Sequence, residues 1–351
     1  MPVPDVLRSL LTAPGPSGYE QRAASIFREA ASAFAEVTYD SVGSTVARVK
    51  GTAGGPMLAV IGHIDEIGLI VHHIDDDGYL WFTGVGGWDP IILVGQRVEV
   101  ATRGGTIPGV VGKKPIHLLR DEERKKAAEM RDLHIDIGAP DGDAARALVR
   151  VGDVAVISGE PVELLGDRVI SRSMDNRLGS YIALQAARLV AERGGAPGDV
   201  AAVGAVQEEI TFGGSRTSAF SLEPDVAIVV DVTHATDAPG IDVKELGKHE
   251  LGSGAVLERG SVLHPMVFER LYEAAEREGI PFTVSASAAR TGTDADAIHV
   301  SRGGVPTGGV SIPLRYMHSP VEMVQTSDID ACAKVIAAFA EALTPETKFV
   351  R

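Results

Sequence analysis

Acidic and histidine side chains recur in this sequence where apolar, strand-like runs end, which is where ligands bind in open α/β sheets. His63 and Asp65 follow the apolar run at residues 57–61. Residues two apart share a face of an extended chain, so the two side chains can point into one site. A histidine that binds a metal usually donates its second N–H to an oxygen acceptor, and Asp65 can take that role. A structural histidine in the core is the competing interpretation of this pair.

Two adjacent glutamates, Glu208 and Glu209, follow another apolar run at residues 200–206. Like charges side by side at the edge of a core repel each other. Coordination of a metal by one glutamate would relieve that repulsion, and the other could then act as a general base with a raised pKa. A solvated pair of glutamates in a loop is the alternative.

Three further residues occupy comparable positions. Asp175 begins a predicted long helix at residues 175–192, where a helix N-cap is the competing interpretation. Asp231 ends an apolar strand, and His318 follows the last predicted strand. The combined set of two histidines and several carboxylates suits zinc, cobalt or manganese. A carboxylate that bridges two such ions about 3.5–4 Å apart would allow them to clamp a hydrolytic water.

Other candidates carry less information. Asp294 lies in a glycine-bordered loop that can line a substrate pocket, although a turn-forming aspartate explains it equally well. His234 is expected to play a structural role or to support a ligand near Asp231. His72, in a β-like run with Asp75, Asp76 and Asp77, is expected to belong to a solvated turn. The single cysteine, Cys332, stands in an apolar helical stretch and is expected to be a packed core thiol.

The elements that must position these residues alternate between strands and helices, which predicts an α/β sheet with helices on both faces. Residues 69–166 interrupt this alternation of strands and helices, because short strand-like runs alternate there with glycine turns. We therefore expect a discontinuous catalytic domain at residues 1–68 and 167–351, with a small β-rich domain inserted at 69–166. The predicted strands lie at 36–39, 46–49, 57–61, 92–100, 154–157, 200–206, 226–230, 281–287 and 310–312, and the predicted helices at 6–11, 20–34, 175–192, 264–278 and 327–343.

Composition limits the possible partners. The chain has 351 residues, a hydrophobic content of 44% and a formal net charge of −15. A strongly acidic protein repels phosphate backbones and anionic lipids, so we expect no nucleic-acid or membrane partner. No apolar run is long enough to span a bilayer, and the first residues lack the basic and apolar segments of a signal peptide. We therefore expect a cytoplasmic protein.

Over essentially its whole length, the sequence resembles the tetrahedral, dinuclear-metal aminopeptidases of peptidase clan MH, which include glutamyl aminopeptidases and some relatives named endoglucanase or cellulase. The number, order and spacing of the shared motifs make chance a poor explanation. The motifs are Gly62-His63-Ile64-Asp65-Glu66-Ile67-Gly68, Gly86-Gly87-Trp88-Asp89, Asp175-Asn176-Arg177-Leu178-Gly179, Gln207-Glu208-Glu209, Asp231-Val232-Thr233-His234, Gly292-Thr293-Asp294-Ala295 and Arg315-Tyr316-Met317-His318-Ser319-Pro320.

The resemblance implies a mixed-sheet, zinc-peptidase-like catalytic domain and an inserted β-rich domain used for dimerisation, with dimers assembled into a dodecamer. It also implies two divalent ions per subunit, with Zn2+ the first expectation and Co2+ the alternative. His63, Asp175 and Asp231 would bind one ion, with Asp175 bridging. Glu209 and His318 would complete the second site.

In the same resemblance, Glu208 is the general base and Asp65 its supporting carboxylate. The expected activity is removal of N-terminal residues from short peptides. Three alternatives remain open: a metal-dependent deacylase or carboxypeptidase on the same fold, an endoglucanase that uses the two adjacent glutamates, and a non-enzymatic scaffold. Ile64 stands where relatives commonly have methionine, and such departures leave the substrate preference open.

Overall fold

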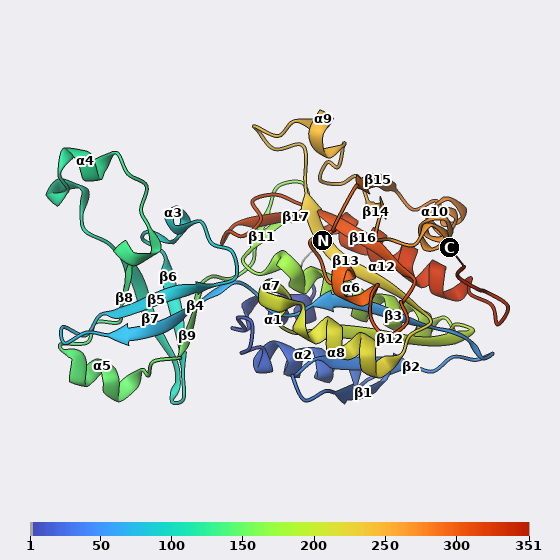
Figure 1. The fold of residues 1–351 in the computed structure, drawn as a ribbon, viewed down its shortest axis with the longest axis horizontal. Helices are drawn as coiled ribbons and strands as arrows, with labels where there is room; N and C mark the ends of the chain where they lie inside the picture. Colours follow the sequence, from blue (N-terminus) through green and yellow to red (C-terminus); the bar gives the residue numbers. More distant parts are fainter. Residues whose placement is uncertain (1–2, 351) are drawn as a thin grey trace.

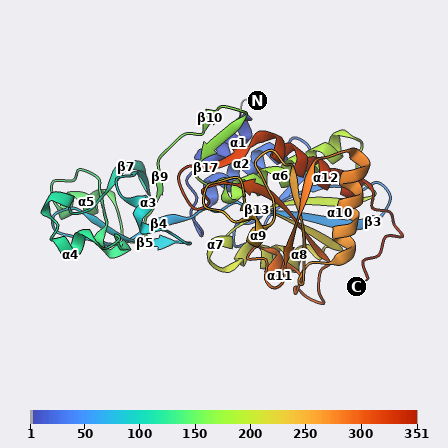
Figure 2. The same ribbon diagram turned by 90° about the horizontal axis from the view of Figure 1, so that it is seen from above.

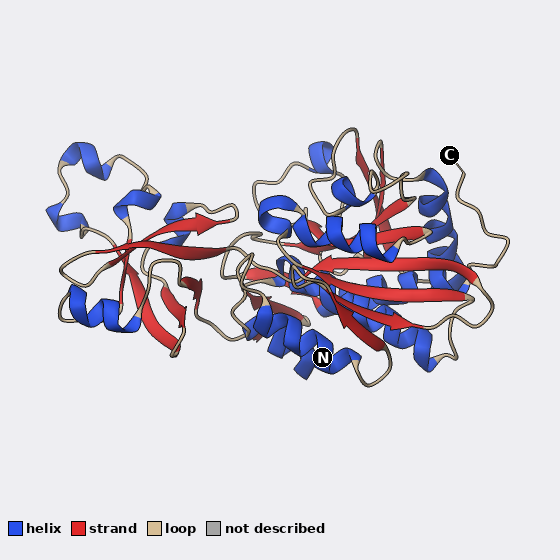
Figure 3. Ribbon diagram, turned by 60° about the horizontal axis from the view of Figure 1, so that its bottom comes forward, coloured by secondary structure: helices blue, strands red, loops and turns tan. Residues whose placement is uncertain are grey.

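The computed structural model of the chain describes residues 3–350. Its larger part is built on an eight-stranded mixed sheet with the order β1-β2-β12-β3-β13-β16-β14-β15 (Figures 1 and 3). The four central strands, from β12 to β16, run parallel to one another, and β2 and β14 flank them antiparallel. The strands are β1 (Glu36–Tyr39), β2 (Thr45–Val49), β3 (Gly55–His63), β12 (Gly198–Ala205), β13 (Val226–His234), β14 (Ala255–Gly260), β15 (Phe282–Ser287) and β16 (Thr307–Leu314).

Helices cover both faces of this sheet because its central strands are apolar on both sides. In β3, Leu58 and Val60 belong to one buried cluster, whereas Ala59 and Ile61 belong to another on the opposite face. Such burial on both faces produces the nearly continuous apolar runs seen in the sequence. One face carries α1 (Asp5–Thr12), α2 (Gln21–Ala31), α6 (Met174–Glu192), α10 (Pro265–Glu278) and α12 (Thr326–Glu341), and the other carries α8 (Gly213–Leu222) and α11 (Ala295–Ile298).

A closed six-stranded barrel with the order β4-β5-β8-β7-β6-β9 projects from the larger part (Figures 1 and 2). It has a hydrophobic core of its own, which includes Leu80, Phe82 and Ile135. The predicted fold class, a mixed α/β sheet with a small β-rich insert, is thus confirmed. The barrel strands are β4 (Gly68–Ile74), β5 (Leu80–Val85), β6 (Arg97–Thr102), β7 (Gly105–Gly112), β8 (His134–Asp136) and β9 (Val154–Ile157), and the helices between them are α3 (Pro90–Leu93), α4 (Asp121–Arg124) and α5 (Gly142–Leu148).

A third, three-stranded sheet returns the chain from the barrel to the helices. It consists of β10 (Val162–Leu164), β11 (Arg168–Ser171) and β17 (Glu322–Gln325), in that order. Because β11 leads directly into α6 and β17 into α12, this sheet joins the starts of two long helices. The remaining short helices are α7 (Glu208–Thr211) and α9 (Val243–Leu246).

One predicted strand was partly wrong. Residues 92–100 were expected to be extended, but α3 ends at Leu93 and β6 begins only at Arg97. Asp89 accepts a hydrogen bond from the backbone N–H of Ile91 at 3.0 Å, and Pro90 stands at the first helical position. A capping aspartate followed by proline starts a helix even when the next residues are β-branched.

Two minor predictions had different outcomes. Cys332 is fully buried in α12, as expected for a core thiol. His72 is exposed as predicted, but it lies within β4 and not in a turn; the turn follows at Asp75, whose side chain accepts from the N–H groups of Asp77 and Tyr79. In residues 3–350, no helix has both the length and the apolar character that crossing a bilayer requires.

Candidate active site

A cavity of about 480 Å³ opens at the carboxyl ends of the central strands. His63 is the last residue of β3 and is paired in register with Ala205, the last residue of β12. Asp231 lies near the end of the neighbouring strand β13. The register of three parallel strands therefore delivers these side chains to one edge of the sheet. The cavity is lined by His63, Asp175, Glu208, Glu209, Ile210, Thr211, Phe212, Asp231, Val232, Thr233, His234, Glu258, Thr291, Gly292, Thr293, Met317 and His318.

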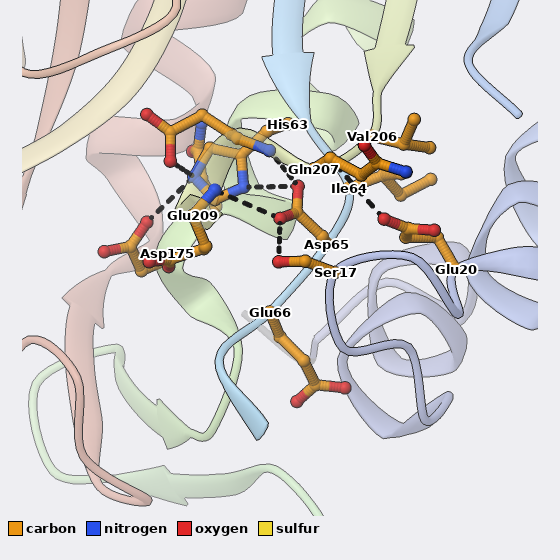
Figure 4. A network of polar contacts seen from close by, with 12 residues as sticks. Ser17, Glu20, His63, Ile64, Asp65, Glu66, Asp175, Val206, Gln207 and Glu209 are labelled. Carbon is orange, nitrogen blue, oxygen red and sulfur yellow. Dashed lines mark hydrogen bonds and ion pairs between the residues drawn. The ribbon is translucent and has the colours of Figure 1, made fainter. Parts of the chain in front are cut away.

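Asp65 connects the histidine to the glutamate pair (Figure 4). Its Oδ1 lies 3.3 Å from His63 Nδ1, and its two oxygens accept from the backbone N–H groups of Glu208 at 3.1 Å and Glu209 at 3.2 Å. Ser17 Oγ donates a further hydrogen bond to Oδ2 at 2.6 Å. The carboxylate is fully buried, so it orients the imidazole of His63 and anchors the start of α7 at the same time. Asp65 thus contacts both His63 and the backbone of the glutamate pair, and its supporting role in catalysis stays a prediction.

Asp175 does not cap its helix. It is the second residue of α6 but has extended backbone angles of φ −78° and ψ 105°, and the capping position belongs to Ser173. Its Oδ1 instead lies 3.2 Å from His63 Nε2, and its Oδ2 lies 3.4 Å from His318 Nε2. The two oxygens of one carboxylate thus face two different histidines. Burial raises its pKa, but hydrogen bonds from His318 and His63 more than offset this and leave the pKa low.

The two glutamates are both drawn into the site. Glu208 Oε2 lies 3.6 Å from His63 Nε2, and Glu209 Oε1 lies 3.4 Å from His318 Nε2. Burial and repulsion by neighbouring carboxylates raise the pKa of Glu208 to about 10, although His63 opposes this. The pKa of Glu209 is also raised, and burial is again the main cause. The alternative of a solvated loop pair is wrong, because both side chains are largely buried.

Asp231 and His318 complete the group. Burial raises the pKa of Asp231 well above its usual range. Hydrogen bonds to Asp175 and Glu209 raise the pKa of His318 to about 11. Potential ligand atoms converge in two overlapping sets, which are His63 with Asp175 and Glu209, and His63 with Glu208 and Asp231. These sets include Glu208 but not His318, whose Nε2 lies 3.4 Å from both Asp175 Oδ2 and Glu209 Oε1, and the predicted division of the ligands between two ions stays a prediction.

The chemistry of this donor set fits divalent cations. Carboxylate and imidazole donors gather here at separations below 4.8 Å, and every cavity-lining residue is described, without a lysine or arginine among them. Raised pKa values for three of the carboxylates show that the site favours additional positive charge. Nitrogen and oxygen ligands of this kind suit zinc, cobalt or manganese.

Two predicted residues, Asp294 and His234, lie outside the group of potential metal ligands. Asp294 is almost fully buried and does not line the cavity, whereas its neighbour Thr293 does; burial raises the pKa of Asp294 to about 6. Contact of Asp294 with substrate therefore stays a prediction. His234 is exposed at the end of β13 and belongs to the cavity rim, so its expected structural role has no buried contact to support it.

Sequence reasoning missed Glu322, the first residue of β17. It is buried, and its two oxygens accept from the backbone N–H groups of Asp175 at 3.1 Å and His318 at 2.8 Å. Its one signal in the sequence is a position four residues after His318, just beyond a proline. That spacing alone does not distinguish it from an exposed glutamate.

Known proteins are similar to this chain in both sequence and fold. The chain matches the M42 glutamyl aminopeptidase family over residues 43–335. It is similar to a lysyl aminopeptidase from Pyrococcus furiosus, with 34% identity over 350 residues and coverage of 97% of both chains. A TET aminopeptidase from a marine-sediment archaeon of the Thaumarchaeota has a similar structure, with a TM-score of 0.93, 34% identity and coverage of 97% and 96%.

A second similar structure is the TET1 peptidase of Pyrococcus horikoshii, which can assemble into a tetrahedron or a large octahedral shell. The TM-score is 0.85 at 30% identity, with coverage of 97% of this chain and 99% of that one. The fold, the convergence of histidines and carboxylates, and the family match over most of the chain agree. The chain therefore belongs to the M42 glutamyl aminopeptidase family, and its activity class is that of an aminopeptidase.

Proposed function

We propose that the protein hydrolyses the N-terminal residue of peptides with two divalent ions and a glutamate general base. The observation that carries the proposal is the position of Asp175, whose two oxygens face His63 at 3.2 Å and His318 at 3.4 Å. A carboxylate placed in this way is suited to bridge two ions. His63 and Asp231 would complete one ion's ligands, and Glu209 and His318 the other's, with Zn2+ expected first and Co2+ as the alternative.

Such ions, when bound, lower the pKa of a shared water and polarise the scissile carbonyl. Glu208 is the side chain placed to accept the proton of that water, because its Oε2 lies 3.6 Å from His63 Nε2 and other residues are proposed as the ligands of both ions. It would then donate the proton to the leaving amine. Asp65 keeps the glutamate pair in place through the N–H groups of both residues. Its bond to His63 also sets which imidazole nitrogen faces the site.

The charge of the cavity supports a substrate with a free α-amine. Its walls carry carboxylates and no lysine or arginine, so a protonated amine is attracted and an acylated terminus is not. Amine recognition next to the ions would limit cleavage to the first residue. The expected substrates are therefore short peptides with unblocked N-termini.

Assembly is proposed from the relatives. The TET1 peptidase of Pyrococcus horikoshii forms a tetrahedron or an octahedral shell, which supports a dodecamer built from dimers for this chain. The projecting barrel, at residues 69–166 in the predicted division, is the surface proposed for dimerisation. Light scattering at micromolar concentration tests this, and a monomer would contradict it.

The activity is tested with matched free and N-acetylated peptides, before and after dialysis against a chelator, with zinc or cobalt added back. Stepwise release from free N-termini only, lost with the chelator and restored by metal, is the expected result. Equal cleavage of acetylated peptides would indicate a deacylase or carboxypeptidase instead. Cleavage of a β-glucan that does not respond to the chelator would indicate the glycosidase.

The general base is tested separately with Glu208→Gln. Loss of the proton acceptor should lower kcat by about 10²- to 10⁴-fold, the usual contribution of general-base catalysis. Metal content, measured on the same preparation, should stay at the wild-type level if Glu208 is not a ligand. Near-normal turnover would exclude the general-base role, and a loss of metal would assign Glu208 to the ligands.

A further inference from the structure

Glu258 is a carboxylate in the cavity that the proposed chemistry does not use. It lies on β14, and its Oε1 accepts a hydrogen bond from Ser311 Oγ of β16 at 2.5 Å. The residue is only partly buried and lines the same cavity as His63 and Asp231. One carboxylate oxygen is therefore held by the neighbouring strand, while the side chain faces the space where substrate would lie.

Strand register places Glu258 on the same face of the sheet as the ligands. Asp231 of β13 is paired with Ser311 of β16, and Glu258 is paired with Gly309, two residues before Ser311. Paired residues, and residues two apart on one strand, point to the same side. Figure 1 shows β13, β16 and β14 as neighbours. Glu258 thus stands two strands from Asp231. At the usual spacing between neighbouring strands, this corresponds to a separation of about 10 Å.

The glycine opposite Glu258 makes room for this arrangement. A Cβ on Gly309 would lie 2.3 Å from Glu258 Oε2 and 2.9 Å from its carboxyl carbon. Any larger residue at position 309 would displace the Glu258 carboxylate from its place over β16. The close approach shows that the side chain lies across the sheet surface, along the cavity floor.

No lysine or arginine lies in the cavity lining to neutralise Glu258, and all of those lining residues are described. Its neighbour Arg259 is turned away, with the guanidinium carbon 5.3 Å from the centre of the Phe268 ring. Arg290 near the rim is paired with Asp296 at 3.3 Å. Burial raises the pKa of Glu258, and the nearby Asp296 adds to this, so a cation bound beside Glu258 would stabilise its ionised form.

We propose that Glu258 determines substrate preference by binding the ammonium or guanidinium group of an N-terminal lysine or arginine. This inference rests on the proposed function, because the side chain of the substrate's first residue extends along the cavity floor toward Glu258 only if the α-amine binds beside the ions. From there, only a long side chain spans most of the distance to Glu258. Acidic N-terminal residues would meet a like charge and be disfavoured.

The test compares kcat/KM for lysyl, arginyl, leucyl and glutamyl dipeptides in the metal-loaded wild type and in Glu258→Gln. The amide keeps the size and the hydrogen bond with Ser311 but removes the charge. Lysyl and arginyl substrates should lose about 10- to 100-fold, the range expected for a hydrogen bond to a charged group. Leucyl substrates should change less than about 3-fold. Glu269→Gln, on the exposed face of α10, is the matched control and should change none of them.

A second measurement needs no variant. Free lysine and norleucine share a four-carbon side chain and differ by the terminal ammonium group of lysine, so lysine should inhibit wild-type hydrolysis of a leucyl dipeptide more strongly. Equal inhibition, or an equal loss for all four substrates in Glu258→Gln, would overturn the assignment of Glu258 while leaving the aminopeptidase proposal intact. No hydrolysis of any free dipeptide with zinc or cobalt would instead refute the proposed function.

Discussion

The carboxylate of Glu322 holds the backbone of Asp175, whose N–H donates to Glu322 Oε2 over 3.1 Å. The other oxygen of Glu322 accepts from the N–H of His318 at 2.8 Å. His318 has a left-handed backbone with φ 58°, a conformation that costs energy for a residue other than glycine. A single buried side chain therefore sets the positions of two proposed ligands from different elements.

We expect Glu322→Ala to lower the number of zinc ions retained per subunit after dialysis, because both N–H groups lose their acceptor. Each buried group left unpaired costs about 1–3 kcal/mol. Glu322→Gln keeps one acceptor oxygen and should retain more metal than the alanine variant. Elemental analysis of the dialysed proteins checks this, and full occupancy in Glu322→Ala would rule out a positioning role.

Asp65→Asn should weaken zinc binding by about 10- to 100-fold, as is typical when the hydrogen-bond partner of a metal-binding histidine is altered. The two oxygens of Asp65 accept hydrogen bonds from the backbone N–H groups of Glu208 and Glu209. The amide nitrogen of asparagine cannot accept a hydrogen bond, so one of these two bonds is lost. Competition with a chromogenic chelator measures the affinity. Ser17→Ala removes one donor to Asp65 and leaves the carboxylate, so it serves as the control with a smaller effect. Wild-type affinity in the asparagine variant would contradict this role.

Glu20 should make stability fall as pH rises from about 4.5 to about 7. Burial raises its folded pKa from 4.5 to about 7, even though its Oε1 accepts from the N–H groups of Gly18 and Gln207. A raised folded pKa means that the contribution is fully present below the unfolded pKa and is lost as pH passes the folded one. The loss is at most about 3 kcal/mol.

Urea unfolding at pH 5 and pH 8 measures this dependence. Glu20→Gln should lose less unfolding free energy than the wild type between the two values, because its side chain does not titrate. Glu29→Gln, an exposed position on α2, should follow the wild type. Parallel profiles for Glu20→Gln and the wild type would show that Glu20 does not carry the effect.

Gly62→Ala should destabilise the fold by about 1–3 kcal/mol, the cost typical of overpacking. A Cβ on Gly62 would lie 2.2 Å from the backbone carbon of Gly179, where β3 meets α6 beside the site. Gly159→Ala is the matched control, because a Cβ there has no neighbour within 4 Å. Denaturant midpoints of the two variants test the difference, and equal midpoints would show that the strand and helix can separate without cost.

The sequence by itself predicted the central strands and most of the charged residues that line the candidate site. Strands buried on both faces appear as short apolar runs, and the polar residues that end them stand out against that background. His63, Glu208, Glu209 and Asp231 were found in this way because each adjoins its strand in the chain. The same local reasoning failed at residues 92–100, where a capping aspartate and a proline outweighed the strand-like residues that follow.

Only the tertiary structure decided what the remaining residues contact. Asp175 reads locally as a helix cap, and its turn toward two histidines depends on where β3 and the segment after β16 come together. Glu322 and Glu258 act through partners on other elements, at pairings that are far apart in the chain. Such contacts depend on strand order and register, which arise from the packing of the whole sheet and leave no local pattern in the sequence.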